Sequence, residues 1–353
     1  ARVVLVMHTS DLSLQGAGAP TVSDVPVMGF QGSRGRRVAR QLVRREEGWF
    51  GVLVAVGILI AIGGSGFWTE FADTMVYYAI LTMGLNFVLG VTGELDFGHA
   101  AFFAVGAYAA AKMMTAHPGA DFLLVIVVAA GTAGAASLLM GFPVFRLRGT
   151  FVALITVALA EIVAVLVTNV QWIGAPEGIS PIPSAHVLGI TLQSYPALLW
   201  FGLILFVIVA AVSLALSRAR FGRALRAIRE DELAARSSGI RPLRYRIAAF
   251  VIAGVFAGIA GAYFAGLFGF VGPASFNITA SFVLGEAVIV GGMGSFLGSV
   301  LGAGVLVGID YLLVDYVPQI AGHEDLVLGA LVVAVILFRP QGILGQPFVR
   351  KRA

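Results

Sequence analysis

ALLWFGLILFVIVAAVSLALS, residues 197–217, is an apolar run without a charge, and RARFGRALRAIREDELAARSSGIRPLRYR, residues 218–246, follows it with nine arginines. A membrane-spanning helix needs roughly 20 apolar residues, and cytoplasmic loops collect lysine and arginine. The junction therefore predicts a transmembrane helix that ends in a loop on the inner face.

The composition of the whole chain supports a membrane protein. Hydrophobic residues make up 59% of the 353 residues and charged residues only 12%, whereas soluble domains carry roughly 25% charged residues. The chain has 45 glycines, and small residues let membrane helices approach closely. It has no cysteine, which excludes disulfides, thiolate nucleophiles and cysteine-bound metals.

Further apolar runs of suitable length occur on both sides of this junction. They predict an all-α polytopic protein of about ten transmembrane helices (eight to ten, some of them broken or re-entrant). The candidate spans are residues 50–68, 75–91, 97–114, 121–142, 150–170, 197–217, 247–268, 278–293, 296–314 and 325–338.

The distribution of charge gives the orientation. With the N-terminus inside and ten alternating spans, 22 of the 23 lysines and arginines fall on the cytoplasmic side, and only Lys112 lies elsewhere. This bias predicts that both termini are cytoplasmic. Because the basic residues flank apolar spans, we exclude a nucleic-acid interface. The outer segments are expected to carry acids, among them Glu70, Asp73, Asp121 and Glu177.

These patterns predict one transmembrane domain with two tails. We expect residues 1–48 to form a disordered and then basic cytoplasmic tail, with residues 34–48 as the basic flank. Residues 49–345 form the transmembrane domain, in which residues 218–246 are a long cytoplasmic loop. Residues 346–353 form a basic C-terminal tail. The loop at residues 171–196, rich in glycine and proline, is expected to form ordered turns outside.

The long inner loop allows two interpretations on pattern alone. Residues 222–238 are compatible with one helix that ends at Gly239, a suitable C-cap, before Pro242. Leu225, Ile228 and Leu233 give this helix a thin apolar stripe. It is either a solvated connector lying against anionic lipid or a short helix that a peripheral partner grips.

Polar residues inside the apolar part of the chain form a second set of candidates. The run Gly90–His99 (GVTGELDFGH) interrupts a hydrophobic stretch. It is either a broken helix beside a translocation path or an ordinary loop on the inner side. Glu161, Glu286 and Asp310 lie within predicted spans. Since a charge at the bilayer centre costs about 2.5–3.5 kcal/mol, these acids should face protein or a pore.

The long loop resembles the EAA loop of ABC-importer permeases, in which a coupling helix docks in a cleft of the ATPase subunit. Leu233, Ala234, Ala235 and Gly239 occupy the places of the Glu-Ala-Ala and Gly pattern, with Glu232 immediately before them. The segment FGRALRAIREDELAARSSGI is very similar to this loop in branched-chain amino-acid permeases of the LivM/LivH type. Further similar stretches lie at residues 85–111, 146–162, 290–303 and 338–345, so the resemblance covers roughly residues 75–345.

This resemblance implies a permease subunit of an ATP-driven importer in a bacterial inner membrane. The residues implied in coupling to the ATPase are Arg226, Glu230, Asp231, Glu232, Leu233, Ala234, Ala235 and Gly239. The residues expected near the translocation path are Asn86, Gly93, Glu94, Asp96, His99, Glu161 and Glu286. The implied substrates are branched-chain or related amino acids, with urea or short amides as the alternative.

The chain carries no catalytic motif. It has neither a Walker A loop nor the HExxH or GxSxG patterns. We therefore expect no cofactor in this chain, with ATP and magnesium on separate subunits. The resemblance implies a second homologous permease, two cytoplasmic ATPases and an extracytoplasmic binding protein as partners. On residues alone, an ion-coupled secondary transporter that uses Glu161, Glu286 or Asp310, or a non-transporting scaffold, stays open.

Overall fold

The computed structural model describes residues 34–64, 66–147, 149–192, 194–316, 324–339 and 341–345. The expected tails at residues 1–33 and 346–353 lie outside these ranges. By its internal contacts the chain divides into two units, residues 1–47 and residues 48–353. The second unit contains the ten apolar segments and is described below.

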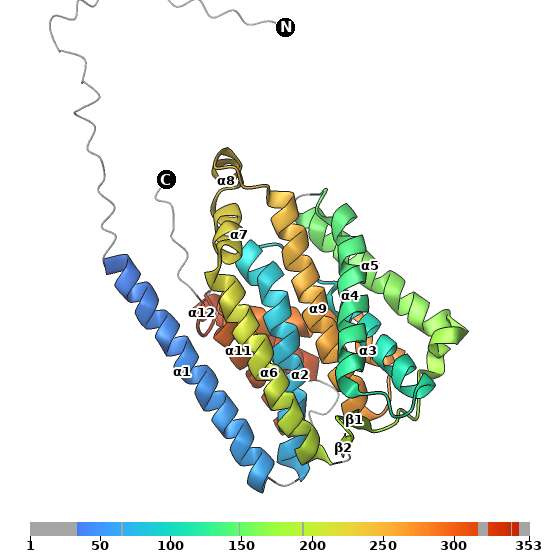
Figure 1. Ribbon diagram of the computed structural model, residues 1–353. Coiled ribbons are helices and arrows are strands. Elements are labelled where there is room, and N and C mark those ends of the chain that lie inside the picture. Colours follow the sequence, from blue (N-terminus) through green and yellow to red (C-terminus); the bar gives the residue numbers. More distant parts are fainter. Residues whose placement is uncertain are drawn as a thin grey trace, which may run out of the picture. The chain divides into compact units, whose positions relative to one another are not determined.

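The fold is helical, with one short hairpin (Figure 1). The apolar helices are α1 (Arg34–Gly63), α2 (Gly66–Asn86), α3 (His99–Ala116), α4 (Phe122–Val144), α5 (Thr150–Asn169), α6 (Tyr195–Arg218), α9 (Pro242–Phe268), α10 (Ile278–Gly291), α11 (Phe296–Tyr316) and α12 (Glu324–Phe338). The remaining elements are the π-helix η2 (Phe87–Thr92), the 3₁₀ turns η3 (Gln171–Ile173), η4 (Ala175–Glu177) and η5 (Pro273–Phe276), the strands β1 (Ala185–Val187) and β2 (Ile190–Leu192), and the polar helices α7 (Arg220–Glu230) and α8 (Glu232–Ser237).

The ten predicted spans coincide with ten helices in the described ranges, which confirms an all-α polytopic protein. Among the residues that the structure describes, five helices are long and apolar enough to cross a membrane, and four shorter apolar helices accompany them. The boundary between the first two spans was wrong, because α1 ends at Gly63 and α2 already begins at Gly66. Helix α1 also begins at Arg34, so the expected basic flank is helical.

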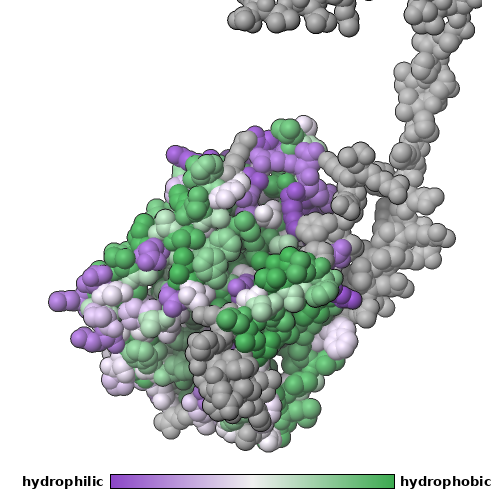
Figure 2. All heavy atoms as spheres, turned by 180° about the vertical axis from the view of Figure 1, so that it is seen from behind, coloured by the Kyte–Doolittle hydropathy of each residue, from purple (hydrophilic) through white to green (hydrophobic). Residues whose placement is uncertain are grey.

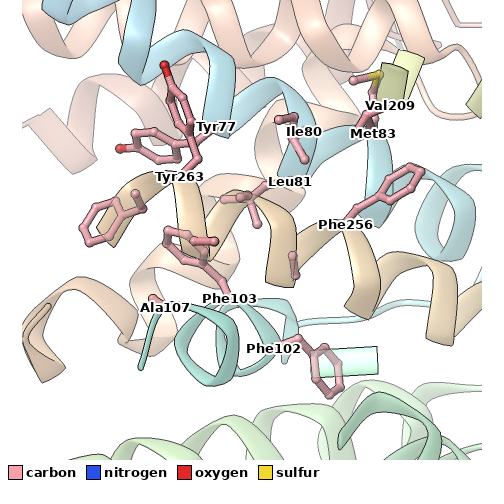
Figure 3. Packing of buried hydrophobic residues seen from close by; sticks show 14 of the residues in the cluster. Tyr77, Ile80, Leu81, Met83, Phe102, Phe103, Ala107, Val209, Phe256 and Tyr263 are labelled. Carbon is pink, nitrogen blue, oxygen red and sulfur yellow. The ribbon is translucent and has the colours of Figure 1, made fainter. Parts of the chain in front are cut away.

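Helix α9 is the centre of the packing and lies against α2, α3 and α4. Aromatic and aliphatic side chains from α2, α3 and α9 meet there, among them Tyr77, Leu81, Phe103 and Tyr263 (Figure 3). Where α3 crosses α9, a Cβ on Gly106 would overlap the backbone of Gly258. The small residues that the composition contains in excess therefore let these helices approach closely.

One buried acid corrects the expected topology. Asp73 was placed in an outer segment, but it lies within α2 and is fully buried. The Tyr263 hydroxyl of α9 donates a hydrogen bond to its carboxylate. A hydrogen-bond partner on another helix makes a carboxyl group tolerable inside a membrane span. The local sequence around Asp73 does not reveal such a partner.

The loop between α5 and α6 contains ordered turns, as expected from its glycines and prolines. It forms η3, η4 and the antiparallel pair of β1 with β2, and Ile179 pairs with Val271 across the chain. Asn277 caps α10 by accepting a hydrogen bond from the Ala280 N–H at 2.9 Å. These contacts fix the end of the unit opposite to α7 and α8 (Figure 1).

Apolar side chains also cover much of the outside. Figure 2 shows a broad hydrophobic area with hydrophilic residues gathered at its upper and left edges. On α4, Val127 is 65% exposed and Leu139 is 76% exposed. Exposure of large aliphatic side chains on this scale fits a surface solvated by lipid.

Two glycine-to-alanine substitutions test the packing of α3 against α9. Gly106→Ala should destabilise the protein by about 1–3 kcal/mol, because the new methyl group overlaps the backbone of Gly258. Gly131→Ala on α4 should be neutral or slightly stabilising, because a Cβ there meets no atom within 4 Å and alanine favours a helix. Thermal unfolding in detergent measures both; equal effects would contradict the packing.

Candidate functional site

The inner end of α2 changes its geometry before the chain leaves the helix. Residues 87–92 form the π-helix η2, and Gly93 ends it with a left-handed φ of 77°. π-Helical turns are rare and often occur at functional sites. The predicted interruption at residues 90–99 therefore begins inside the helix.

Two distant segments hold this broken end. The Asn86 side-chain oxygen accepts a hydrogen bond from the N–H of Gly294, in the turn between α10 and α11, at 2.9 Å. The Arg229 guanidinium of α7 donates to the carbonyl oxygen of Gly90. The irregular backbone is thus satisfied by protein groups, as a low-dielectric surrounding requires.

The segment after η2 is pinned to α5 and α10. The N–H of Phe97 donates to the Thr156 hydroxyl at 3.2 Å, and the N–H of Ala100 donates to the Ser281 hydroxyl at 3.0 Å. Asp96 and His99 are both buried, and the Asp96 carboxylate lies 3.5 Å from Nδ1 of His99. These two predicted path residues form a buried pair at the start of α3.

The long inner loop contains two helices, whereas a single helix was predicted. The break lies at Asp231, whose carboxylate accepts hydrogen bonds from the N–H groups of Leu233 and Ala234 and so begins α8. Gly239 follows α8 with φ of 81°, which confirms its expected capping role. The expected apolar stripe is divided as well, because Leu225 is buried whereas Leu233 is 75% exposed.

Arg246, in α9, joins the loop to the broken end of α2. Its guanidinium lies 2.9 Å from the Glu94 carboxylate and 3.1 Å from the Glu232 carboxylate. Glu232 also pairs with Arg236 on α8. Arg246 therefore connects Glu94, which was predicted near the translocation path, with Glu232, which was predicted to couple to the ATPase.

The two acids respond differently to this arrangement. Burial raises the pKa of Glu94, and the Arg246 charge offsets that rise only in part. Burial acts to raise the pKa of Glu232 too, but the charges of Arg246 and Arg236 outweigh it and hold that pKa below its ordinary value. Glu94 thus depends most on Arg246 to stay ionised.

An open cavity of about 570 Å³ lies beside this ion bridge. Its lining combines one acid, two guanidinium groups and several aliphatic side chains. The lining residues are Leu89, Thr92, Gly93, Glu94, Leu95, Gly149, Ile228, Arg229, Arg246 and Met293. Among the described residues, no group of three or more His, Asp or Glu could hold a metal ion.

Other predicted residues lie apart from the cavity or act locally. Arg226 donates to the Ser217 carbonyl at 2.9 Å and so ties α7 to the end of α6. Glu230 is exposed, and Ala235 is buried. Among the acids, Glu286 is partly buried on α10 and Glu161 is exposed on α5; neither lines the cavity.

Sequence reasoning missed the two arginines that organise the site. Arg229 and Arg246 were counted only as part of the basic loop. Each meets its acceptor across more than a hundred residues of sequence, at Gly90 and Glu94 respectively. No local pattern indicates such a pairing.

Several known proteins resemble this chain in sequence. The family model described as "Branched-chain amino acid transport system / permease component" matches residues 67–336. The chain is 36% identical to the high-affinity branched-chain amino acid transport system permease protein LivM of Escherichia coli K12, over 78% of this chain and 69% of LivM. The like-named permease proteins BraD of Pseudomonas aeruginosa (29%) and LivH of E. coli K12 (28%) align over 78% of this chain and 93% of their own lengths. No solved structure matches.

A double-mutant cycle tests the bridge. Arg246→Met should destabilise the protein by about 1–3 kcal/mol, because Glu94 loses its counter-charge in a mostly buried place. Glu94→Gln should recover part of that loss when combined with Arg246→Met. Thermal or denaturant unfolding in detergent provides the readout.

Arg236→Met is the matched control for this cycle. It removes an arginine that also pairs with Glu232 but is 47% exposed, so its effect should stay within about 1 kcal/mol. Additive effects of the Glu94 and Arg246 substitutions would show that the bridge contributes nothing.

Proposed function

Because the chain belongs to the branched-chain amino acid permease family of ABC importers, we propose that residues 219–241 couple it to separate ATPase subunits. The chain is a transport subunit of the inner membrane. ATP and magnesium would bind to the ATPases, which would drive the helices between outward-open and inward-open states.

The observation that carries this proposal is the exposure of Leu233. Leu233 stands 75% exposed on α8, in a loop that the excess of arginine places in the cytoplasm. A large aliphatic side chain in water at the tip of a charged loop offers apolar surface that a docked protein would bury. The exposed residues around it, Glu230, Ala234 and Gly239, would form the rim of that contact.

Contacts behind α8 support a route for the movement. Force on α8 would reach Glu94 through Glu232 and Arg246, at 3.1 and 2.9 Å. Force on α7 would reach Gly90 through Arg229. Both routes end at the broken inner end of α2. Because the geometry there is irregular, this is where the helix would bend most easily.

We also propose that the chain pairs with a second, homologous permease and receives substrate from an extracytoplasmic binding protein. LivM and LivH of E. coli K12 are two different chains, each named a permease protein of a high-affinity branched-chain amino acid transport system, and both match this chain. That pattern supports two permease chains for one system.

Branched-chain or related amino acids are the proposed substrates. The names of the relatives support this class, and so does the cavity at the inner end of α2. Leu89, Leu95, Ile228 and Met293 suit an aliphatic side chain. Glu94 or Arg229 would bind a charged group of the substrate by exchanging Arg246 or the Gly90 carbonyl for it. Urea or short amides would use the same machinery without the charged contacts.

Leu233→Ser tests the docking of the ATPase. It should reduce co-purification of the ATPase and ATP-driven uptake several-fold, because it removes apolar surface that the docked ATPase would bury. The thermal stability of the permease itself should not change, since the side chain is in solvent.

Leu188→Ser is the matched control, because Leu188 is 78% exposed in the turn between β1 and β2, at the opposite end of the fold. It should leave ATPase association in detergent intact. Normal ATPase binding and uptake in the Leu233 variant would exclude α8 as the docking element.

A further inference from the structure

Helix α5 contacts the rest of the protein through one narrow stripe. The buried residues of the helix repeat every three or four positions, as one helical face requires. They are Val152, Ala153, Thr156, Ala160, Val163 and Val167. The helix lies at the edge of the unit next to α4 (Figure 1).

The opposite face of α5 is open. It presents aliphatic and aromatic side chains, together with one acid. Phe151 is 65% exposed, Leu154 62% and Val165 54%, and Glu161 is exposed between them. Ala158, one turn before Glu161, is exposed as well and leaves room for a close approach.

Glu161 lies near the middle of the candidate membrane span formed by α5. It is about 17 Å along the helix from Thr150 and about 12 Å from Asn169, at 1.5 Å per residue. Within the described part of the chain, no hydrogen bond or ion pair reaches its carboxylate. Lipid chains offer no hydrogen bond to a carboxyl group, whether ionised or neutral, so a group outside this part of the chain has to provide one.

The depth of Glu161 limits what can provide that group. An ATPase stays on the inner face, and a binding protein stays on the outer face. Among the proposed partners, only the second permease subunit reaches the centre of the bilayer. Helix α4 is the contrast, since its outward residues such as Leu139 are apolar and suit lipid.

We propose that the outward face of α5, centred on Glu161, packs against the second permease subunit, which offers a hydrogen-bond donor or a cation to the carboxylate. This proposal rests on the proposed function and names the surface used for pairing. If α5 met α5 of an identical chain about a two-fold axis, two carboxyl groups would face each other and neither helix would supply a cation. The geometry therefore favours a different, homologous chain.

Photo-crosslinking in native membranes tests the surface. Benzoyl-phenylalanine at Leu154 or Val165 should link this chain to a homologous permease chain identified by mass spectrometry. The same probe at Leu139 on α4 should link mainly to lipid. Crosslinks from α5 only to lipid, or only to copies of this chain, would overturn the proposal.

Substitution of Glu161 tests the role of the carboxylate. Glu161→Leu should lower co-purification of the second permease several-fold, whereas Glu161→Gln, which keeps hydrogen-bonding capacity, should retain more of it. In the separated chain, Glu161→Leu should unfold at the same or a higher temperature than the wild type, because a lipid-facing charge is gone. Lower stability of the separated chain with unchanged pairing would assign Glu161 an internal role.

The failure of this proposal can be told from the failure of the proposed function. ATPase co-purification through α8 should persist in the Glu161 variants if only the pairing surface is misplaced. If neither an ATPase nor a second permease co-purifies with the wild-type chain, the importer assignment itself is wrong.

Discussion

The structure depends on the fact that lipid offers no hydrogen bonds, so every polar group on a span must find a partner within protein. Asp73 meets Tyr263 on a neighbouring helix, and Asn86 meets the backbone of Gly294. The irregular backbone at Gly90 is bonded by an arginine. Polar residues therefore mark where helices are joined, and Glu161 is an exposed acid on α5 to which the described chain gives no such partner.

The same constraint connects the cytoplasmic loop to the membrane. The broken end of α2 needs donors, and Arg229 and Arg246 provide them from α7 and α9. Arg246 also holds Glu232 on α8. The groups that satisfy α2 are thus the groups that fix the coupling loop, so a displacement of the loop disturbs the least regular part of a membrane helix.

Much of this architecture follows from local patterns. Ten apolar runs, the excess of arginine on one side and the cap at Gly239 are visible because each depends on neighbouring residues. The division of the loop was not predicted because Asp231 lies in a run that is compatible with one helix. Its side chain instead caps the start of α8, and α7 ends there. The Arg246 bridge was missed for another reason: its partners are distant in sequence. The exposure of Leu233 results from this division of the loop into α7 and α8, so it was not predicted either.

The most direct test of this account is the distance between spin labels on the cysteine-free chain in the assembled complex. Labels at Leu95 and Ser237 report on the inner end of α2 and on α8, and a third position, Gly189, reports on the opposite end of the fold. ATP binding should leave the 95–237 distance unchanged while the 189–237 distance changes, because the loop and the end of α2 move together. A 95–237 distance that changes as much as the 189–237 distance would contradict the account.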